Sequence, residues 1–267
     1  MLLKRRRLSL SQNFLHNQEL VNQLIGRSSI AKKDLILEIG PGKGIITQQL
    51  VKQANQVIAI ELDQPLYYYL KKKFSSTPNL KLYHQDFLNF NLPQKPYKVF
   101  ANLPFAIEGK TIRKLLNTNH PPQDSYLVIR RDLANRLVGI TYNSQFSILN
   151  KPWFTFEIFH QFKRSDFTPQ PKVNSTMLRF TQRKSPLLPL SEKPFYRWFI
   201  LRGFSGGRGI NKSLKNILTY HQLKTQSNLH GFSPKAKPTD LSFKQWLSLY
   251  QFFKSKTGLK SPLIPMH

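Results

Sequence analysis

Short apolar runs alternate with amphipathic stretches through roughly the first 180 residues of the chain. This alternation is typical of a mostly parallel β-sheet whose two faces are covered by helices. The apolar runs predict strands at residues 35–40, 56–62, 80–83, 97–101 and 126–129. Between the strands, residues 45–52 and 66–74 have the periodicity of helices. We therefore expect an α/β fold.

The pattern changes in the last third of the chain. Residues 153–159 and 176–180 alternate in the manner of strands, and we expect them to form an antiparallel edge. The stretch that follows contains Pro186, Pro189 and Pro194, and prolines interrupt both helices and sheets. Beyond this linker, helical periodicity returns at residues 195–202, 212–220 and 243–253. We accordingly expect a first domain of residues 1–184 and a small helical domain of residues 185–267.

The composition of the chain indicates that its partner is a polyanion. The chain has 41 Lys and Arg residues against 13 Asp and Glu residues, a formal net charge of +28. So many positive charges repel one another unless a polyanion binds and neutralises them. Nucleic acid is the leading class of partner. Residues 151–267 hold 20 basic and 4 acidic residues, so we expect this portion to grip the nucleic acid. Further basic clusters that can neutralise phosphates lie at residues 4–7, 71–73, 113–114, 130–131 and 163–164.

Several classes of protein are disfavoured. No apolar run reaches the roughly 18 residues of a membrane span, and the basic residues 4–7 are not followed by the continuous apolar core of a signal peptide. We expect a cytoplasmic protein with no membrane partner. The chain has no cysteine, and its seven histidines show no paired spacing, so we expect no metal site. Because no heptad seam suggests an obligate dimer, we expect a monomer.

A glycine-rich turn follows the first predicted strand, at residues 40–44. Glycines in a strand-to-helix turn let a ligand approach bare backbone, and Glu61, at the end of the next strand, can bind both hydroxyls of a ribose. Asp86 ends the third strand and can accept a hydrogen bond from an adenine amino group, although capping a helix would explain it equally well. These features indicate a nucleoside cofactor. The glycine spacing fits neither the dinucleotide fingerprint nor the P-loop.

The fourth predicted strand runs into Asn102-Leu103-Pro104-Phe105, and here the chain resembles the rRNA adenine N6-methyltransferases. Four motifs in the same order carry the resemblance, namely this one together with residues 12–15 (Gln-Asn-Phe-Leu), 38–44 and 167–175. The match covers residues 9–183 well and the remainder loosely. It implies a Rossmann-like class I methyltransferase domain, S-adenosyl-L-methionine as methyl donor and rRNA as substrate.

The resemblance also implies a catalytic set, which comprises Asn102, Leu103, Pro104, Phe105 and Phe167. The Asn102 side-chain oxygen and the backbone carbonyl of Leu103 or Pro104 would accept hydrogen bonds from the adenine amino group. Phe105 would stack on the extruded base, and Phe167 would supply the opposing face. Plain core packing is the alternative for both rings, since the chain has 20 Phe residues.

The resemblance implies a cofactor-binding set as well, comprising Asn13, Leu15, Gly40, Glu61, Asp86 and Asn102. Asn13 and Leu15 would contact the methionine end, and Gly40 would make a main-chain contact. Glu61 would bind the ribose and Asp86 the adenine amine. A helix cap is the alternative explanation for Asn13.

Two branches of the family are open. The Erm enzymes methylate one adenine of 23S rRNA and confer resistance to macrolides, lincosamides and streptogramin B, whereas the KsgA-type enzymes dimethylate 16S rRNA. Residues 202–209 lack the basic run that the KsgA branch carries there, and residues 153–159 resemble the Erm side, which favours Erm. A non-catalytic nucleic-acid-binding relative is disfavoured by the intact residues 102–105 and Glu61. A nicotinamide-dependent dehydrogenase is disfavoured by the glycine spacing.

Overall fold

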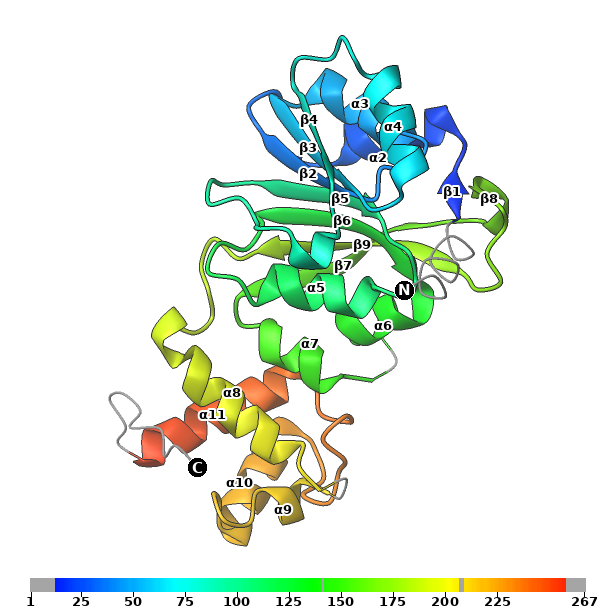
Figure 1. The fold of residues 1–267 in the computed structure, drawn as a ribbon. Coiled ribbons are helices and arrows are strands. Elements are labelled where there is room, and N and C mark those ends of the chain that lie inside the picture. Colours follow the sequence, from blue (N-terminus) through cyan, green and yellow to red (C-terminus); the bar gives the residue numbers. More distant parts are fainter. Residues whose placement is uncertain (1–12, 141, 207–208, 258–267) are drawn as a thin grey trace. The chain divides into compact units, whose positions relative to one another are not determined.

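The computed structural model describes residues 13–140, 142–206 and 209–257 (Figure 1). The chain divides into two compact units. One holds the residues up to Ala134 together with Phe156–Gln182, and the other holds Asn135–Thr155 together with the residues from Arg183 onward. The break at residue 183 lies near the predicted linker, while Asn135–Thr155 joins the second unit from an earlier part of the chain. The functional division into residues 1–184 and 185–267 stays a prediction.

A seven-stranded sheet organises the described part of the first unit (Figure 1). Its order is β4 (Leu80–His84), β3 (Gln56–Glu61), β2 (Leu35–Ile39), β5 (Lys98–Asn102), β6 (Asp124–Arg130), β9 (Ser175–Gln182) and β7 (Phe154–Gln161). The pairs from β4 through β6 are parallel, whereas β9 runs antiparallel to β6. The predicted α/β fold and each predicted strand are therefore confirmed.

Helices bury the faces of this sheet. They are α2 (Gln18–Arg27), α3 (Ile45–Gln53), α4 (Gln64–Lys73), α5 (Glu108–Leu116) and α6 (Arg131–Val138). Leu24 of α2 and Leu50 of α3 pack in one apolar cluster with Val57 and Phe100 of the sheet. The residue after Phe100 in β5, Ala101, points to the opposite face and is also fully buried. Burial on both faces explains why the strands are continuous apolar runs in the sequence.

The strand order places a crevice between β2 and β5. From β2 the chain moves outward to β3 and β4, and it then returns to form β5 and β6 on the other side. In parallel α/β sheets, ligands bind at the carboxyl ends of the strands where the order reverses in this way. Ile39 lies opposite Ala101 in the register, so Gly40 and Asn102 leave the sheet side by side.

Helices make up most of the second unit's described residues. They are α7 (Gln145–Asn150), α8 (Lys193–Gly203), α9 (Ile210–Ser213), α10 (Tyr220–His230) and α11 (Phe243–Thr257). The helices predicted at residues 195–202 and 243–253 are confirmed. The helix predicted at 212–220 is wrong, because α9 ends at Ser213 and Thr219 forms a capping box with Gln222 that starts α10.

Two short strands and three 3-10 turns complete the fold. The strands β1 (Phe14–Leu15) and β8 (Phe167–Thr168) pair antiparallel, so that Leu15 lies opposite Phe167. The turns are η1 (Phe87–Asn89), η2 (Arg164–Asp166) and η3 (Leu190–Glu192). The β1–β8 pair joins the first and the last of the four sequence motifs.

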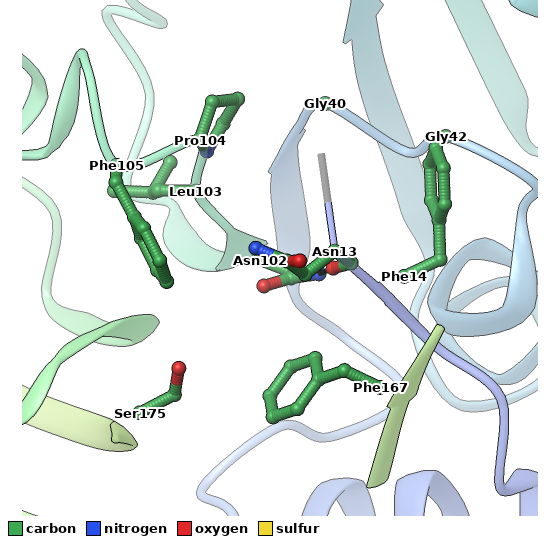
Figure 2. A pocket seen from close by; sticks show the side chains of 10 residues that line it. All are labelled: Asn13, Phe14, Gly40, Gly42, Asn102, Leu103, Pro104, Phe105, Phe167 and Ser175. Atoms are coloured by element: carbon green, nitrogen blue, oxygen red, sulfur yellow. Dashed lines mark hydrogen bonds between the residues drawn. The ribbon is translucent and has the colours of Figure 1, made fainter. Parts of the chain in front are cut away.

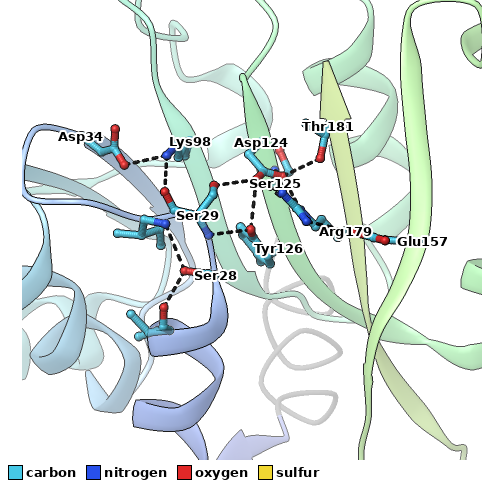
Figure 3. A network of polar contacts seen from close by, with 12 residues as sticks. Ser28, Ser29, Asp34, Lys98, Asp124, Ser125, Tyr126, Glu157, Arg179 and Thr181 are labelled. Atoms are coloured by element: carbon cyan, nitrogen blue, oxygen red, sulfur yellow. Dashed lines mark hydrogen bonds and ion pairs between the residues drawn. The ribbon is translucent and has the colours of Figure 1, made fainter. Parts of the chain in front are cut away.

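Asp124, the first residue of β6, is the centre of a polar network in the first unit (Figure 3). Its carboxylate accepts hydrogen bonds from Arg179 (2.8 Å), from the Ser29 hydroxyl (2.6 Å) and from the Thr181 hydroxyl (2.9 Å). Burial alone would raise the pKa of Asp124, but the hydrogen bonds from Arg179, Ser29 and Thr181 outweigh it and hold the pKa below its ordinary value. The ionised carboxylate therefore ties the segment after α2 to β6 and β9.

Replacing this carboxylate should destabilise the protein. We expect Asp124→Ala to lower the free energy of unfolding by about 3 kcal/mol, since it removes one partner of a largely buried ion pair. Glu157→Ala removes the exposed second partner of Arg179 and should cost less than about 1 kcal/mol. Urea denaturation measures both changes, and equal losses would contradict this account.

The same network predicts a pH dependence. The pKa of Asp124 is depressed in the folded state, so its stabilisation is complete above the ordinary Asp pKa of about 4 and is lost as the pH falls through the folded value. Below about pH 4, the free energy of unfolding of the native chain should fall more steeply than that of Asp124→Ala. Parallel slopes in urea denaturation from pH 6 to pH 2 would contradict the prediction.

Candidate functional site

A pocket opens at the carboxyl ends of β2 and β5 (Figure 2). About 420 Å³ of empty space lies within its bounds, and this volume includes space that is open to solvent. The residues that line it are Asn13, Phe14, Gly40, Gly42, Asn102, Leu103, Pro104, Phe105, Phe167 and Ser175. All four sequence motifs contribute to this set, although more than 160 residues separate Asn13 from Ser175. The fold thus brings the motifs to one place.

The glycine turn presents bare backbone to the pocket. Gly40, Gly42 and Gly44 have φ angles of +67°, +57° and +77°, a region that disfavours residues with a Cβ atom. A Cβ atom on Gly42 would lie 2.6 Å from the Phe14 ring, whereas one on Gly40 would have its nearest neighbour, the Asn102 carbonyl oxygen, 4.0 Å away. Gly42 therefore makes room for Phe14, and Gly40 leaves its backbone accessible.

The Asn102 amide has a defined orientation. Its Nδ2 donates a hydrogen bond of 2.7 Å to the Asn13 carbonyl oxygen. A carbonyl oxygen can only accept, so this contact identifies the amide nitrogen and leaves Oδ1 as the acceptor that Asn102 offers to the pocket.

The backbone hydrogen bonds after Asn102 distinguish the Leu103 carbonyl from the Pro104 carbonyl as an acceptor for the adenine amino group. The Leu103 N–H donates to the Val128 carbonyl (3.2 Å), and the Pro104 carbonyl accepts from the Ile107 N–H (3.0 Å). No described residue donates to the Leu103 carbonyl. Of the two alternatives left open by the sequence, the Leu103 carbonyl is therefore the one without an internal partner in the part of the chain that the structure describes.

Two aromatic rings stand in the pocket wall. In Figure 2 the Phe105 ring, the Phe167 ring and the Asn102 amide surround one open space. Phe167 is held by β8 and by edge-to-face packing against Phe162, with ring centroids 5.3 Å apart. Leu15 does not line the pocket; it is buried where β1 pairs with Phe167.

Glu61 supports the glycine turn and is not among the pocket-lining residues. Its Oε2 accepts from the Gly42 N–H (3.0 Å) and its Oε1 from the Asp63 N–H (2.9 Å). Burial raises the pKa of Glu61, and these backbone hydrogen bonds partly offset the rise. Each oxygen keeps a further lone pair.

A second carboxylate, Glu38, lies in β2 two residues before Gly40. Both its oxygens are buried and have no hydrogen-bond partner among the described residues. Burial raises the pKa of Glu38 to about 8. The polar groups of neighbouring Thr47 lower this pKa, whereas electrostatic repulsion from Glu61 raises it. At neutral pH Glu38 is therefore mostly uncharged and adds little negative charge beside Glu61.

Asp86 caps the η1 turn, because its Oδ1 accepts a hydrogen bond from the Leu88 N–H (2.8 Å), and the cofactor role of this residue stays a prediction. Its loop is held in place by Lys114 of α5. The Lys114 ammonium donates to the carbonyls of Phe87 (3.0 Å), Leu88 (2.8 Å) and Phe90 (2.6 Å). Because an ammonium group has three donors, Lys114 is fully occupied within the protein and has no donor left for a phosphate.

The other predicted basic clusters differ in how available their side chains are for phosphate binding. Arg130 pairs with the buried Glu108 carboxylate at 3.0 Å, whereas Lys71, Lys72 and Lys73 are exposed at the end of α4. The predicted cluster at residues 4–7 lies outside the described residues.

Within the described ranges there is no group of three side chains suited to a metal ion and no helix long and apolar enough to cross a membrane.

Sequence reasoning missed three of the pocket-lining residues, namely Phe14, Gly42 and Ser175. All three lie inside motifs that were recognised, so the motifs signalled their importance, but only the fold shows that they face the same space.

The residues present fit S-adenosylmethionine. The Gly40 backbone is accessible, and the Glu61 carboxylate lies at the end of β3 with acceptor capacity left for hydroxyl groups. Asp86 lies at the equivalent end of β4, as expected for residues that line one side of a nucleoside.

Comparisons with known proteins agree with the geometry. The family described as "Ribosomal RNA adenine dimethylase" matches residues 3–255. The "Ribosomal RNA small subunit methyltransferase A" of Acaryochloris marina (strain MBIC 11017) is 33% identical over 253 residues, which cover 90% of this chain and 94% of that protein. An "rRNA adenine N-6-methyltransferase" of Escherichia coli is 30% identical over 260 residues, covering 94% and 97%.

Solved structures extend the likeness to the whole fold. The 23S rRNA methyltransferase ErmE superposes with a TM-score of 0.84 at 25% identity and covers 91% of this chain and 100% of its own. A dimethyladenosine transferase from Plasmodium falciparum shares the fold with a TM-score of 0.73 at 24% identity, covering 91% and 98%. The chain belongs to the ribosomal RNA adenine dimethylase family and is an S-adenosylmethionine-dependent rRNA adenine N6-methyltransferase.

Proposed function

We propose that this chain methylates N6 of one adenine in 23S rRNA and thereby confers resistance to macrolides, lincosamides and streptogramin B. The observation that carries this proposal is the likeness to ErmE, which extends over that chain's full length with a TM-score of 0.84. We further propose that the protein acts as a cytoplasmic monomer.

Dimethylation of an adenine in 16S rRNA is the second candidate. It is supported by the small-subunit methyltransferase of Acaryochloris marina, which is 33% identical over 90% of this chain. Both candidates use the same chemistry, and they differ in the RNA that is bound.

In the proposed reaction, Asn102 Oδ1 and the Leu103 carbonyl accept hydrogen bonds from the adenine N6 amino group. This nitrogen is a poor nucleophile because its lone pair is delocalised into the ring. Two acceptors placed out of the base plane favour a tetrahedral nitrogen and aim its lone pair at the methyl group. The contact between Asn102 and Asn13 supports this assignment, since it leaves Oδ1 as the acceptor.

The target base has to leave its stack before N6 can be reached. We assign Phe105 and Phe167 to hold the extruded base, because their rings flank the space beside Asn102 (Figure 2). Stacking of a base on an aromatic side chain contributes about 1–3 kcal/mol. Phe105 has no hydroxyl group, so stacking rather than a phenolic hydrogen bond does the holding.

S-adenosylmethionine supplies a methyl group bonded to a positively charged sulfur. We assign Asn13 to its methionine end, the Gly40 backbone to a main-chain contact, Glu61 to the ribose hydroxyls and Asp86 to the adenine amine. Leu15 was expected at the methionine end as well, but its side chain is buried in the core, and we give it no direct contact. Asn102 contacts both the cofactor and the base. The helical C-terminal domain and the exposed residues Lys71–Lys73 are assigned to phosphate binding.

The substrate test is transfer of labelled methyl from S-adenosylmethionine to purified, unmodified 23S and 16S rRNA in parallel, with the modified base located by primer-extension arrest. We expect label on one 23S adenine. Label on 16S rRNA would establish the second candidate instead. Tight RNA binding without label on either RNA would contradict catalysis.

Removing the Asn102 amide tests the catalytic assignment. Asn102→Ala should lower kcat by about 10²–10³, as loss of a single preorganised hydrogen-bonding group typically does, while the RNA Kd stays within about twofold. Asn91→Ala, in an exposed loop, is the matched control and should behave as the native chain. An Asn102→Ala enzyme with unchanged kcat would contradict the mechanism.

The Glu61 assignment has a separate test. Glu61→Ala should weaken binding of S-adenosylhomocysteine at least about tenfold in calorimetry, because two ribose hydrogen bonds are lost and each is worth about 1 kcal/mol. RNA affinity should not change. The exposed Glu19→Ala controls for loss of negative charge, and equal cofactor affinity in Glu61→Ala and Glu19→Ala would refute the assignment.

A further inference from the structure

Ser175 is the first residue of β9 and lines the pocket opposite the Asn102 motif. Only 2% of this residue's surface is exposed. Its backbone is fixed, because the Ser175 carbonyl accepts from the Phe162 N–H (3.3 Å) and the preceding Asn174 carbonyl accepts from the Arg131 N–H (2.9 Å). The position of the Ser175 hydroxyl is therefore set by the sheet.

This hydroxyl has no hydrogen-bond partner among the described residues. A buried hydroxyl without a partner is unfavourable, and most buried polar groups in proteins have one. The next residue shows the usual arrangement, since the Thr176 hydroxyl donates to the His160 carbonyl at 2.7 Å. In Figure 2 the Ser175 hydroxyl is directed toward the open space beside Phe105 and Phe167. A partner supplied by a bound molecule would satisfy it.

We infer that the Ser175 hydroxyl donates a hydrogen bond to a ring nitrogen of the target adenine. This inference rests on the proposed function, which places the base between Phe105 and Phe167 with its amino group at Asn102. The faces of the base then meet aromatic rings, and its edge meets the polar groups of the pocket. The ring nitrogens N1, N3 and N7 of adenine are acceptors, so they match a hydroxyl donor.

This contact would make Ser175 a specificity-determining residue. Asn102 Oδ1 and the Leu103 carbonyl select an amino group, which adenine and cytosine both carry, and neither acceptor reads the ring. A donor at the ring edge adds a second criterion that depends on the position of a purine nitrogen. Sites built to hydrogen-bond a substrate reject analogues that lack the partner, since a buried polar group is then left unpaired.

Ser125 provides a matched control. It lies in β6, the strand beside β9, it is fully buried, and its hydroxyl likewise has no partner among the described residues. It is not among the residues that line the pocket. If a buried unpaired hydroxyl served only the packing of this sheet, the two serines would respond alike to substitution.

The test uses a synthetic RNA hairpin whose sequence is that of the rRNA segment methylated by the native enzyme. Its target position carries adenosine, 1-deazaadenosine, 3-deazaadenosine or 7-deazaadenosine. We expect Ser175→Ala to lower kcat/KM on the adenosine hairpin about tenfold, the effect of one hydrogen bond. One deaza hairpin should lower the native enzyme's kcat/KM equally, and on that hairpin Ser175→Ala should match the native enzyme. Ser125→Ala should match it on all four.

Thermal unfolding separates function from folding. Loss of an unpaired buried hydroxyl should leave the Tm of Ser175→Ala equal to or above that of the native chain. Should Ser175→Ala fail to fold, Ser175→Cys, whose thiol is slightly larger than the hydroxyl and a weaker donor, takes its place in the same assay.

The outcomes distinguish the two levels of the account. No methylation of the adenosine hairpin or of intact rRNA by the native enzyme would overturn the proposed function itself. Methylation by the native enzyme with an unchanged rate for Ser175→Ala would overturn only the inference about Ser175. A Ser175→Ala defect of equal size on all four hairpins would do the same, because the hydroxyl would then not contact a ring nitrogen.

Discussion

The hydrogen bond from Asn102 Nδ2 to the Asn13 carbonyl is the contact on which the site depends. It joins the segment before β1 to the end of β5 and fixes which atom of the Asn102 amide remains as an acceptor. The β1–β8 pairing then carries Phe167 to the same space, and Gly42 leaves room for Phe14 beside the turn. The hydrogen bond itself connects two of the four motifs and gives the proposed catalytic amide its direction, and the contacts of Phe14 and Leu15 bring the other two motifs to the same place.

The sheet explains why this contact forms where it does. The strand order reverses between β2 and β5, so the ends of these two strands are the natural ligand-binding crevice of the fold. A strongly basic chain keeps few carboxylates, and three of them, Glu38, Glu61 and Asp86, lie in or just after β2, β3 and β4. Glu38 is mostly uncharged at neutral pH and Glu61 is held by backbone amides, so the group near the turn avoids strong mutual repulsion.

The features that could be predicted from the sequence are those that depend on residues close together along the chain. Apolar runs gave the strands because buried parallel strands are continuously apolar, and the motif at residues 102–105 indicated the site. The failures arose from contacts between distant residues. Nothing in the local sequence shows that Lys114 is occupied by three carbonyls or that Ser175 faces the pocket. The helix predicted at 212–220 failed because the Thr219 capping box starts a helix inside that span.

The most direct test of the central claim is the kcat of Asn102→Asp measured beside that of Asn102→Ala. Aspartate keeps two acceptor oxygens for the adenine amino group, but it cannot donate to the Asn13 carbonyl and would repel it. If the Asn13 contact orients the amide, Asn102→Asp should be as inactive as Asn102→Ala. An Asn102→Asp enzyme with close to the native kcat would show that an acceptor at this position is sufficient, and would contradict the account.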